Sequence, residues 1–256
     1  MHDDEGSGPA VVLLHAGVAD RRMWRPLVPA LSAAHRVVTP DLRGWGETPL
    51  PGGRYTDADD LAHLLDELGI DRATLVGASF GGRVALEFAA MHPDRVDTLV
   101  LLNPAYRGLE VTDPAIIEFD EQEDALLESG DIDGAVSLNV DLWLGPAATD
   151  EARVDLARMQ RHAFEVQLAA DELDPPPQPD RLEVDATQLH LPTTIVTGAH
   201  DATHFREVAA LLTREIESSA LVELDWAGHL PALERPVAVA DLLLAHLDGR
   251  GVAPVV

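Results

Sequence analysis

The sequence predicts an α/β fold in which a mainly parallel sheet is flanked by helices, with a helical cap inserted before the penultimate strand. Short apolar runs alternate with helical hydrophobic patterns along most of the chain. Continuous apolar runs indicate strands that are buried on both faces, as in a parallel sheet. Each run is followed within a few residues by Gly or Pro, which favours a strand end. The runs are 10–14, 36–39, 73–76, 98–102, 194–197 and 221–224.

Amphipathic helices are predicted between these runs, because apolar residues recur there every three or four positions. The stripe over 61–68 has the clearest ends. Thr56, three residues before Asp59, resembles a capping box, and Gly69 follows the last apolar position. The remaining stripes lie at 84–91, 205–216 and 240–247.

A longer segment, from Tyr106 to His190, breaks the alternation. It is rich in Asp and Glu, and its apolar patterns at 116–129, 135–144 and 150–173 are helical. It ends in the Pro-rich run 174–179, which can form neither a regular helix nor a central strand. We therefore predict a core of residues 1–105 and 188–256 and a helical cap of residues 106–187. A separate helical domain is the alternative, but the return of a strand pattern at Thr194 favours an insertion.

Composition restricts the possible partners. The 256 residues carry a formal charge of −27, from 45 acidic residues against 18 basic ones, and every basic residue is Arg. A field of this sign repels phosphate backbones and anionic membranes, so we expect no nucleic acid or membrane partner. The same field predicts neutral or weakly charged substrates. No apolar run reaches the ~18–20 residues of a membrane span, and the acidic start at residues 1–5 is unlike a secretory signal. We expect a cytoplasmic protein.

Residues 77–81, Gly-Ala-Ser-Phe-Gly, contain the clearest catalytic pattern, G-x-S-x-G. A predicted strand precedes the pattern and a predicted helix follows it. A tight strand-to-helix turn needs small residues around the serine, and it exposes the hydroxyl at a helix N-terminus. The sequence has no cysteine, which removes thiolate nucleophiles and Cys-ligated metals. Ser79 is therefore the candidate nucleophile, and a passive serine in a Gly-rich turn is the alternative.

A serine nucleophile needs a base, and the base needs an acid to orient it. His229 follows the last predicted strand, and Asp201 follows the penultimate one. Both positions fall at the carboxyl edge of the sheet, where α/β active sites lie. His200 and His204 have the spacing of a helical metal pair, but no third ligand is obvious nearby. We predict no metal, and a capping or rim role for both.

These residues together resemble the α/β-hydrolase fold family, in its serine-nucleophile branch, over nearly all of residues 9–247. Residues 41–48, Asp-Leu-Arg-Gly-Trp-Gly-Glu-Thr, look like the family's D-x-R-G-x-G-x-S/T loop. Residues 14–17, Leu-His-Ala-Gly, stand where its oxyanion loop lies. The resemblance implies backbone donors at Phe80 and Gly17. Ala16 replaces a usual Gly, which leaves Gly17 and Val18 as alternatives for the second donor. With eight residues before Pro9, the sheet is expected to be shortened at its antiparallel edge.

The resemblance implies acyl transfer in two steps on small carboxylic esters or lactones, with Ser79, Asp201 and His229 as the triad and without a metal or organic cofactor. Alternatives are a C–C bond or thioester hydrolase, or a non-hydrolytic ligand-binding or cyclase member of the fold. The expected partner is a small-molecule substrate, and the sequence does not indicate an oligomeric state. Trp143, Met159 and Leu230 are candidate pocket walls, with cap–core packing as the alternative for Trp143 and Met159.

Overall fold

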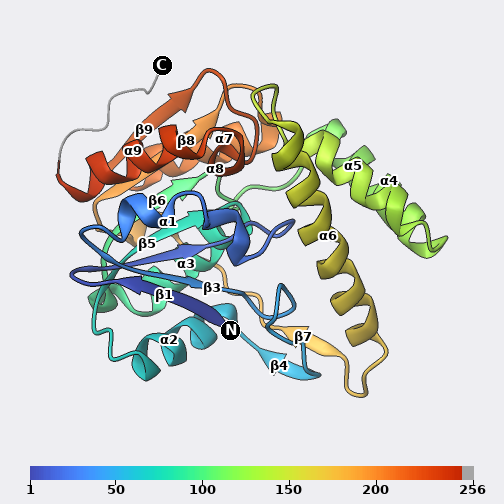
Figure 1. Ribbon diagram of the computed structural model, residues 1–256, viewed down its shortest axis with the longest axis horizontal. Coiled ribbons are helices and arrows are strands. Elements are labelled where there is room, and N and C mark those ends of the chain that lie inside the picture. The colour runs from blue at the N-terminus through green and yellow to red at the C-terminus, as the bar shows by residue number, and fades with distance from the viewer. Residues whose placement is uncertain (250–256) are drawn as a thin grey trace.

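A seven-stranded sheet forms the centre of the molecule in the computed structural model, which describes residues 1–249 (Figure 1). Its order is β1-β3-β2-β5-β6-β8-β9, and every neighbouring pair is parallel except β1 with β3. The last residues of the expected core segment, 250–256, lie outside the described residues. The strands are β1 His2–Gly6, β2 Ala10–Leu14, β3 Arg36–Pro40, β5 Ala73–Ala78, β6 Val96–Leu102, β8 Thr193–Gly198 and β9 Ser219–Leu224. All six predicted strands are present.

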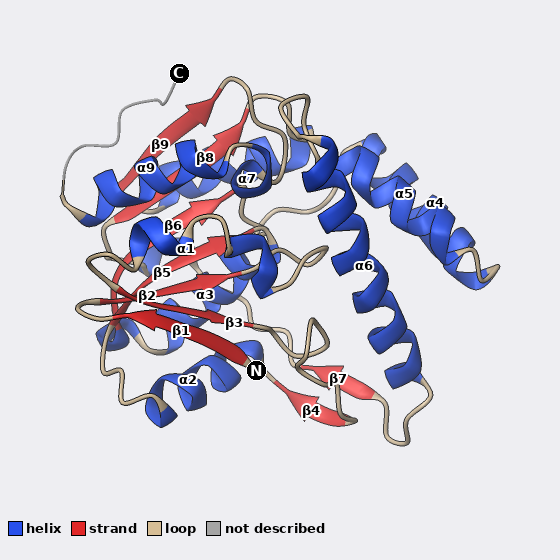
Figure 2. Ribbon diagram, viewed as in Figure 1, coloured by secondary structure: helices blue, strands red, loops and turns tan. Residues whose placement is uncertain are grey.

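Helices cover both faces of this sheet (Figure 2). α1 (Val28–Leu31) and α9 (Pro236–Leu247) pack on one face, and α2 (Asp57–Glu67), α3 (Phe80–Met91) and α7 (Thr203–Glu215) on the other. The side chains of β2 alternate between the two cores, with Val11 and Leu13 in the first and Val12 and Leu14 in the second. This double burial explains the continuous apolar runs of the sequence.

Three helices fill the segment between β6 and β8: α4 (Pro114–Glu128), α5 (Ile132–Trp143) and α6 (Asp150–Asp171). They lie beyond the carboxyl ends of the central parallel strands (Figure 1). The Pro-rich run that follows contributes only β7 (Pro177–Pro179), which pairs with β4 (Gly53–Tyr55) in a separate two-stranded sheet. We call α4–α6 the helical insertion; its division from the core at residues 106 and 187 stays a prediction.

Short elements were not expected from the hydrophobic pattern. They are α1, β4, β7, α8 (Pro231–Glu234) and the 3₁₀ helices η1 (Arg21–Trp24), η2 (Pro93–Arg95) and η3 (Ala186–Gln188). The antiparallel edge of the sheet is a single strand, because residues 2–6 form β1. This strand is acidic and largely exposed, so its pairing comes from the backbone ladder and from the ion pair of Asp4 with Arg36 at 2.7 Å.

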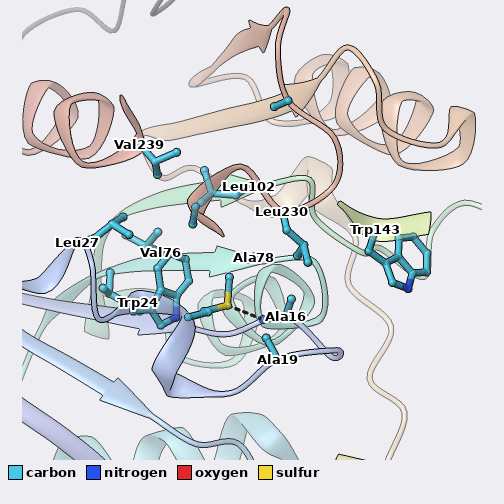
Figure 3. Packing of buried hydrophobic residues seen from close by; sticks show 14 of the residues in the cluster. Ala16, Ala19, Trp24, Leu27, Val76, Ala78, Leu102, Trp143, Leu230 and Val239 are labelled. Atoms are coloured by element: carbon cyan, nitrogen blue, oxygen red, sulfur yellow. Dashed lines mark hydrogen bonds between the residues drawn. The ribbon is translucent and has the colours of Figure 1, made fainter. Parts of the chain in front are cut away.

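The apolar core beneath α1 and α9 reaches the carboxyl edge of the sheet. Figure 3 shows Trp24 and Leu27 packed against the sheet, with Ala16 and Ala78 at the edge of the same cluster. The N–H of Ala16 donates to the sulfur of Met23 at 3.4 Å. The core therefore fixes the loop after β2 close to the residue that precedes Ser79. None of the helices within residues 1–249 has the length and apolar character needed to cross a bilayer.

Candidate active site

Ser79 lies at the turn between β5 and α3, with φ 49° and ψ −112°. A non-glycine residue at positive φ is strained, and such strain persists where the surrounding structure enforces it. The N–H of Ser79 donates to the carbonyl of Leu102, at the end of β6, at 2.9 Å. The Ser79 carbonyl accepts the N–H groups of Ala105 and Arg83 at 2.9 and 3.1 Å. The turn is thus held by the neighbouring strand and by its own helix.

The glycines of the G-x-S-x-G pattern are required by close backbone approach. A Cβ built on Gly81 would overlap the carbonyl oxygens of Leu14 and His15, on the strand and loop that adjoin the turn. A Cβ on Gly77 would overlap the carbonyl of Gly81. Because the obstacles are backbone atoms, no side-chain rearrangement can relieve them. The pattern therefore encodes the strand-to-helix turn that sequence analysis predicted.

We expect Gly81→Ala to lower the free energy of unfolding by about 3 kcal/mol, because an added methyl overpacks this backbone contact. Gly69→Ala is the matched comparison. Gly69 has φ +63° but open space around its missing Cβ, so only the backbone penalty of about 1–2 kcal/mol applies there. Urea unfolding of both variants measures the two losses. Equal losses would mean that the close approach at Gly81 has no energetic weight.

Asp201 and His229 are brought together by the loops after β8 and β9. The Nδ1 of His229 lies 3.0 and 2.9 Å from the two carboxylate oxygens of Asp201. Both side chains are almost inaccessible, at 3% and 1% exposure. A carboxylate facing Nδ1 fixes the tautomer that carries its proton there, so Nε2 is left as the basic nitrogen. Within residues 1–249 the Ser79 hydroxyl makes no hydrogen bond to this ring; such bonds are often long without substrate.

Asn103 joins the two loops that carry the acid and the base. Its side-chain N–H₂ donates to the carbonyls of Gly228 and His229 at 3.0 and 2.9 Å, and its Oδ1 accepts the N–H of Gly198 at 2.8 Å. The residue is fully buried and has φ 45°. This role was not identified from the sequence. The signal was an Asn directly after a strand, where the chain adopts a left-handed conformation.

We expect Asn103→Ala to lower both stability, by about 2–4 kcal/mol, and kcat, by about tenfold or more. The loss leaves buried backbone groups unpaired, each worth about 1–3 kcal/mol. Asn103→Gly separates the two causes, since glycine accepts the positive φ but supplies no amide. Urea unfolding and ester turnover of both variants measure how much of each loss comes from the amide and how much from the backbone conformation. Full recovery in the glycine variant would show that only the backbone conformation matters.

Glu234 of α8 supports the histidine loop from the other side. Its carboxylate oxygens accept the N–H of Gly228 at 3.0 and 3.1 Å. Burial raises the pKa of this carboxyl, against the opposing effect of its backbone hydrogen bonds. A Cβ on Gly145, which follows α5, would come within 2.6 Å of Glu234 Oε2. The helical insertion therefore meets the histidine loop here, a contact that the hydrophobic pattern did not reveal.

The expected oxyanion loop is fixed by His15, which is fully buried. Its Nδ1 donates to the carbonyl of Ala16 at 2.8 Å, and its Nε2 accepts the N–H of Leu42 at 2.9 Å. A Cβ on Gly17 would lie 3.4 Å from the Cβ of Phe80, so the two expected donor residues are neighbours. Within the described chain neither Gly17 nor Val18 uses its N–H in a hydrogen bond. The choice between them stays open.

Aromatic rings cover His229. The rings of Trp143 and Phe205 lie 4.7 and 4.2 Å from its imidazole, centroid to centroid. Of the three expected pocket walls, only Trp143 contacts the catalytic candidates in this way. Leu230 is fully buried in the apolar core, near Ala78 (Figure 3). Met159 is buried on α6 and lines a hollow of about 230 Å³ whose lining does not include His229.

The His200 and His204 pair shows no third ligand. Among residues 1–249, no group of three or more His, Cys, Asp or Glu side chains is placed to hold a metal ion. The N–H of His200 donates to the carbonyl of Ala227 at 2.9 Å, which ties together the loops that carry Asp201 and His229. His204 is buried, and burial lowers the pKa of its imidazole.

Comparison with known proteins finds similarity over most of the chain. The alpha/beta hydrolase fold family model matches residues 9–236. A 2-hydroxy-6-oxo-2,4-heptadienoate hydrolase of Pseudomonas putida is 42% identical over 117 residues, 43% of this chain and 42% of that protein; the match thus spans less than half of that relative's length. A pimeloyl-[acyl-carrier protein] methyl ester esterase of Aeromonas hydrophila is 28% identical over 93% of this chain and 95% of its own. A thermophilic esterase from Thermogutta terrifontis superposes with a TM-score of 0.75 at 27% identity, covering 97% and 93% of the two chains.

Proposed function

The chain belongs to the alpha/beta hydrolase fold family, and on this premise we propose that it hydrolyses small carboxylic esters or lactones through an acyl-enzyme on Ser79. The observation that carries the proposal is the buried Asp201–His229 pair at the same sheet edge as a strained serine that begins a helix. A serine hydroxyl needs such a base to become a nucleophile. The two esterases described above, similar over almost the whole chain, favour the ester as the bond that is cleaved.

The proposed reaction has two halves. His229 Nε2 takes the proton of Ser79 as its oxygen attacks the substrate carbonyl, and then gives that proton to the departing alcohol. Water, deprotonated by His229, attacks the acyl-enzyme, releases the acid and restores the serine. Asp201 stabilises the imidazolium formed in each half. The N–H of Phe80, at the start of α3, and that of Gly17 or Val18 would stabilise the oxyanion; each such donor contributes ~2.7–4 kcal/mol.

A C–C bond hydrolase is the second candidate. It is favoured by the 42% identity with the Pseudomonas putida hydrolase, although the match covers under half of each chain. The same serine, histidine and oxyanion donors could serve that reaction, so the residues of the triad do not distinguish the two.

An activity screen with covalent labelling tests the proposal. The substrates are p-nitrophenyl esters, simple lactones, a thioester and a 2-hydroxy-6-oxo-dienoate. We expect burst kinetics on the activated esters, and a fluorophosphonate adduct that peptide mass analysis locates on Ser79. Turnover of the dienoate alone would replace ester hydrolysis by C–C bond hydrolysis. Tight ligand binding with neither adduct nor turnover would indicate a non-hydrolytic member of the fold.

A further inference from the structure

A hollow of about 440 Å³ is lined by residues that contact Ser79 and His229, although these two residues do not line it themselves. Arg83 and Ala105 line it, and the N–H groups of these two residues are the ones bonded to the Ser79 carbonyl. Phe205, on its other side, packs against the ring of His229 at 4.2 Å. A group bound in this hollow would therefore lie next to the proposed site of acyl transfer. Its volume is in the lower part of the range for small-molecule sites.

The hollow is basic, in contrast to the chain as a whole. Arg83, Arg107 and Arg181 line it, against one acidic lining residue, Glu183. The full sequence has 45 acidic residues and 18 basic ones. Three arginines at one small hollow are therefore a local reversal of charge. At physiological salt, distant surface carboxylates are screened beyond about 8 Å, so the nearby guanidinium groups dominate inside the hollow.

Arg83 and Arg107 form ion pairs with buried carboxylates, but these contacts lack hydrogen-bond geometry within the described chain. Within residues 1–249 none of the three donates a side-chain hydrogen bond, although the side chains of Arg83 and Arg107 are only 18% and 28% exposed. By contrast, Arg22 and Arg36 each bind a carboxylate through two nitrogens. A planar guanidinium matches the geometry of a carboxylate.

Two buried carboxylates, Glu87 and Asp57, are the ion-pair partners of Arg83 and Arg107. Glu87 lies 3.5 Å from Arg83 and 3.6 Å from Arg107, and Asp57 lies 3.6 Å from Arg83, without hydrogen-bond geometry. Burial raises the pKa of both carboxyls, that of Asp57 to about 6. The guanidinium of Arg83 is also stacked on the ring of Phe80 at 4.3 Å. This contact holds it in place beside the turn that carries Ser79.

We propose that this hollow binds a carboxylate of the substrate, held by Arg83, Arg107 and Arg181, so that the enzyme prefers esters or lactones carrying a second, ionised carboxyl group. The identity of the ligand as a substrate rests on the proposed hydrolase function. The proposal replaces the expectation of neutral substrates, which followed from the net charge alone.

A matched pair of substrates tests it. Mono-p-nitrophenyl glutarate and p-nitrophenyl pentanoate have acyl chains of equal length, and only the first ends in a carboxylate. We expect kcat/KM to be at least tenfold higher for the glutarate, mostly through a lower KM. We expect the ratio of the two kcat/KM values to fall about tenfold in Arg107→Gln and in Arg181→Gln, since each variant loses a bond to a charged group. The side chain of Arg181 is exposed. Arg72→Gln, beside Asp97 at the opposite end of the sheet, is the control of equal charge change.

Calorimetric titration with glutarate separates this proposal from the proposed function. We expect glutarate to bind the wild-type enzyme and to bind Arg107→Gln about tenfold more weakly. If neither ester is hydrolysed but this binding pattern holds, hydrolysis fails and the carboxylate site stands. Equal turnover of the two esters, or glutarate binding that is the same in Arg107→Gln and Arg72→Gln, would overturn the carboxylate site.

Discussion

Ser79→Ala is expected to lower kcat on a p-nitrophenyl ester by about 10⁶, with KM nearly unchanged. In the proposed mechanism the hydroxyl is the group that bonds to the substrate carbon, and no cysteine is present in the sequence to replace it. The turn itself should survive, since alanine removes one oxygen and keeps the Cβ. The residual activity of the variant would come from the oxyanion donors and from substrate binding. Turnover under single- and multiple-turnover conditions measures the loss.

Ser137→Ala, on the exposed side of α5, is the control for the loss of a hydroxyl elsewhere. It should keep wild-type turnover and should still be labelled by a fluorophosphonate. Retention of more than a hundredth of the activity in Ser79→Ala would show that another group makes the attack.

The strands, the helices and the turn at Ser79 could be predicted because their determinants are local. Double burial makes β2 and β5 continuously apolar, and close backbone approach requires Gly77 and Gly81. The capping box at Thr56 is another local signal, and it is confirmed by the N–H of Asp59, which donates to the Thr56 hydroxyl at 3.0 Å. β1 has no such signal. An exposed edge strand needs only backbone pairing, so its acidic residues show no hydrophobic pattern.

Asn103 and Glu234 could not be identified as site residues for a different reason. Asn103 acts on a loop that only the fold brings near it, on residues 125 and 126 positions away, at Gly228 and His229. Glu234 acts on Gly228, six positions away, across a turn that no sequence pattern marks. A residue's type does not reveal which distant carbonyl it will bind. The same holds for the carboxylate site, since Arg83, Arg107 and Arg181 come from three separate segments.

The proposed carboxylate site and the net charge point to substrates of different charge, because net charge averages over the whole surface. The acidic residues of α4, for example, are mostly exposed. Counter-ions screen such charges within about one Debye length, whereas a partly buried guanidinium acts at contact distance. The sign of the local cluster, not of the chain, should therefore determine which substrate is held beside Ser79.

Asp201→Asn is expected to lower kcat by about 10⁴ while leaving the loop in place. In the native protein both carboxylate oxygens of Asp201 face Nδ1 of His229. An amide can turn its N–H₂ toward that nitrogen, and Nδ1 then becomes the acceptor. The proton moves to Nε2, which can no longer take the proton of Ser79. Asp225→Asn, an exposed change four residues before His229, is the control for the altered charge and should retain wild-type turnover.

The double variant Ser79→Ala/Asp201→Asn tests whether the acid acts only through the serine. Once the hydroxyl is gone, His229 has no serine proton to accept, so the tautomer has no further consequence for this route. We therefore expect the double variant to be as active as Ser79→Ala alone, with strong non-additivity between the two sites. A further loss in the double variant would mean that Asp201 and His229 also catalyse attack by water, independently of the acyl-enzyme.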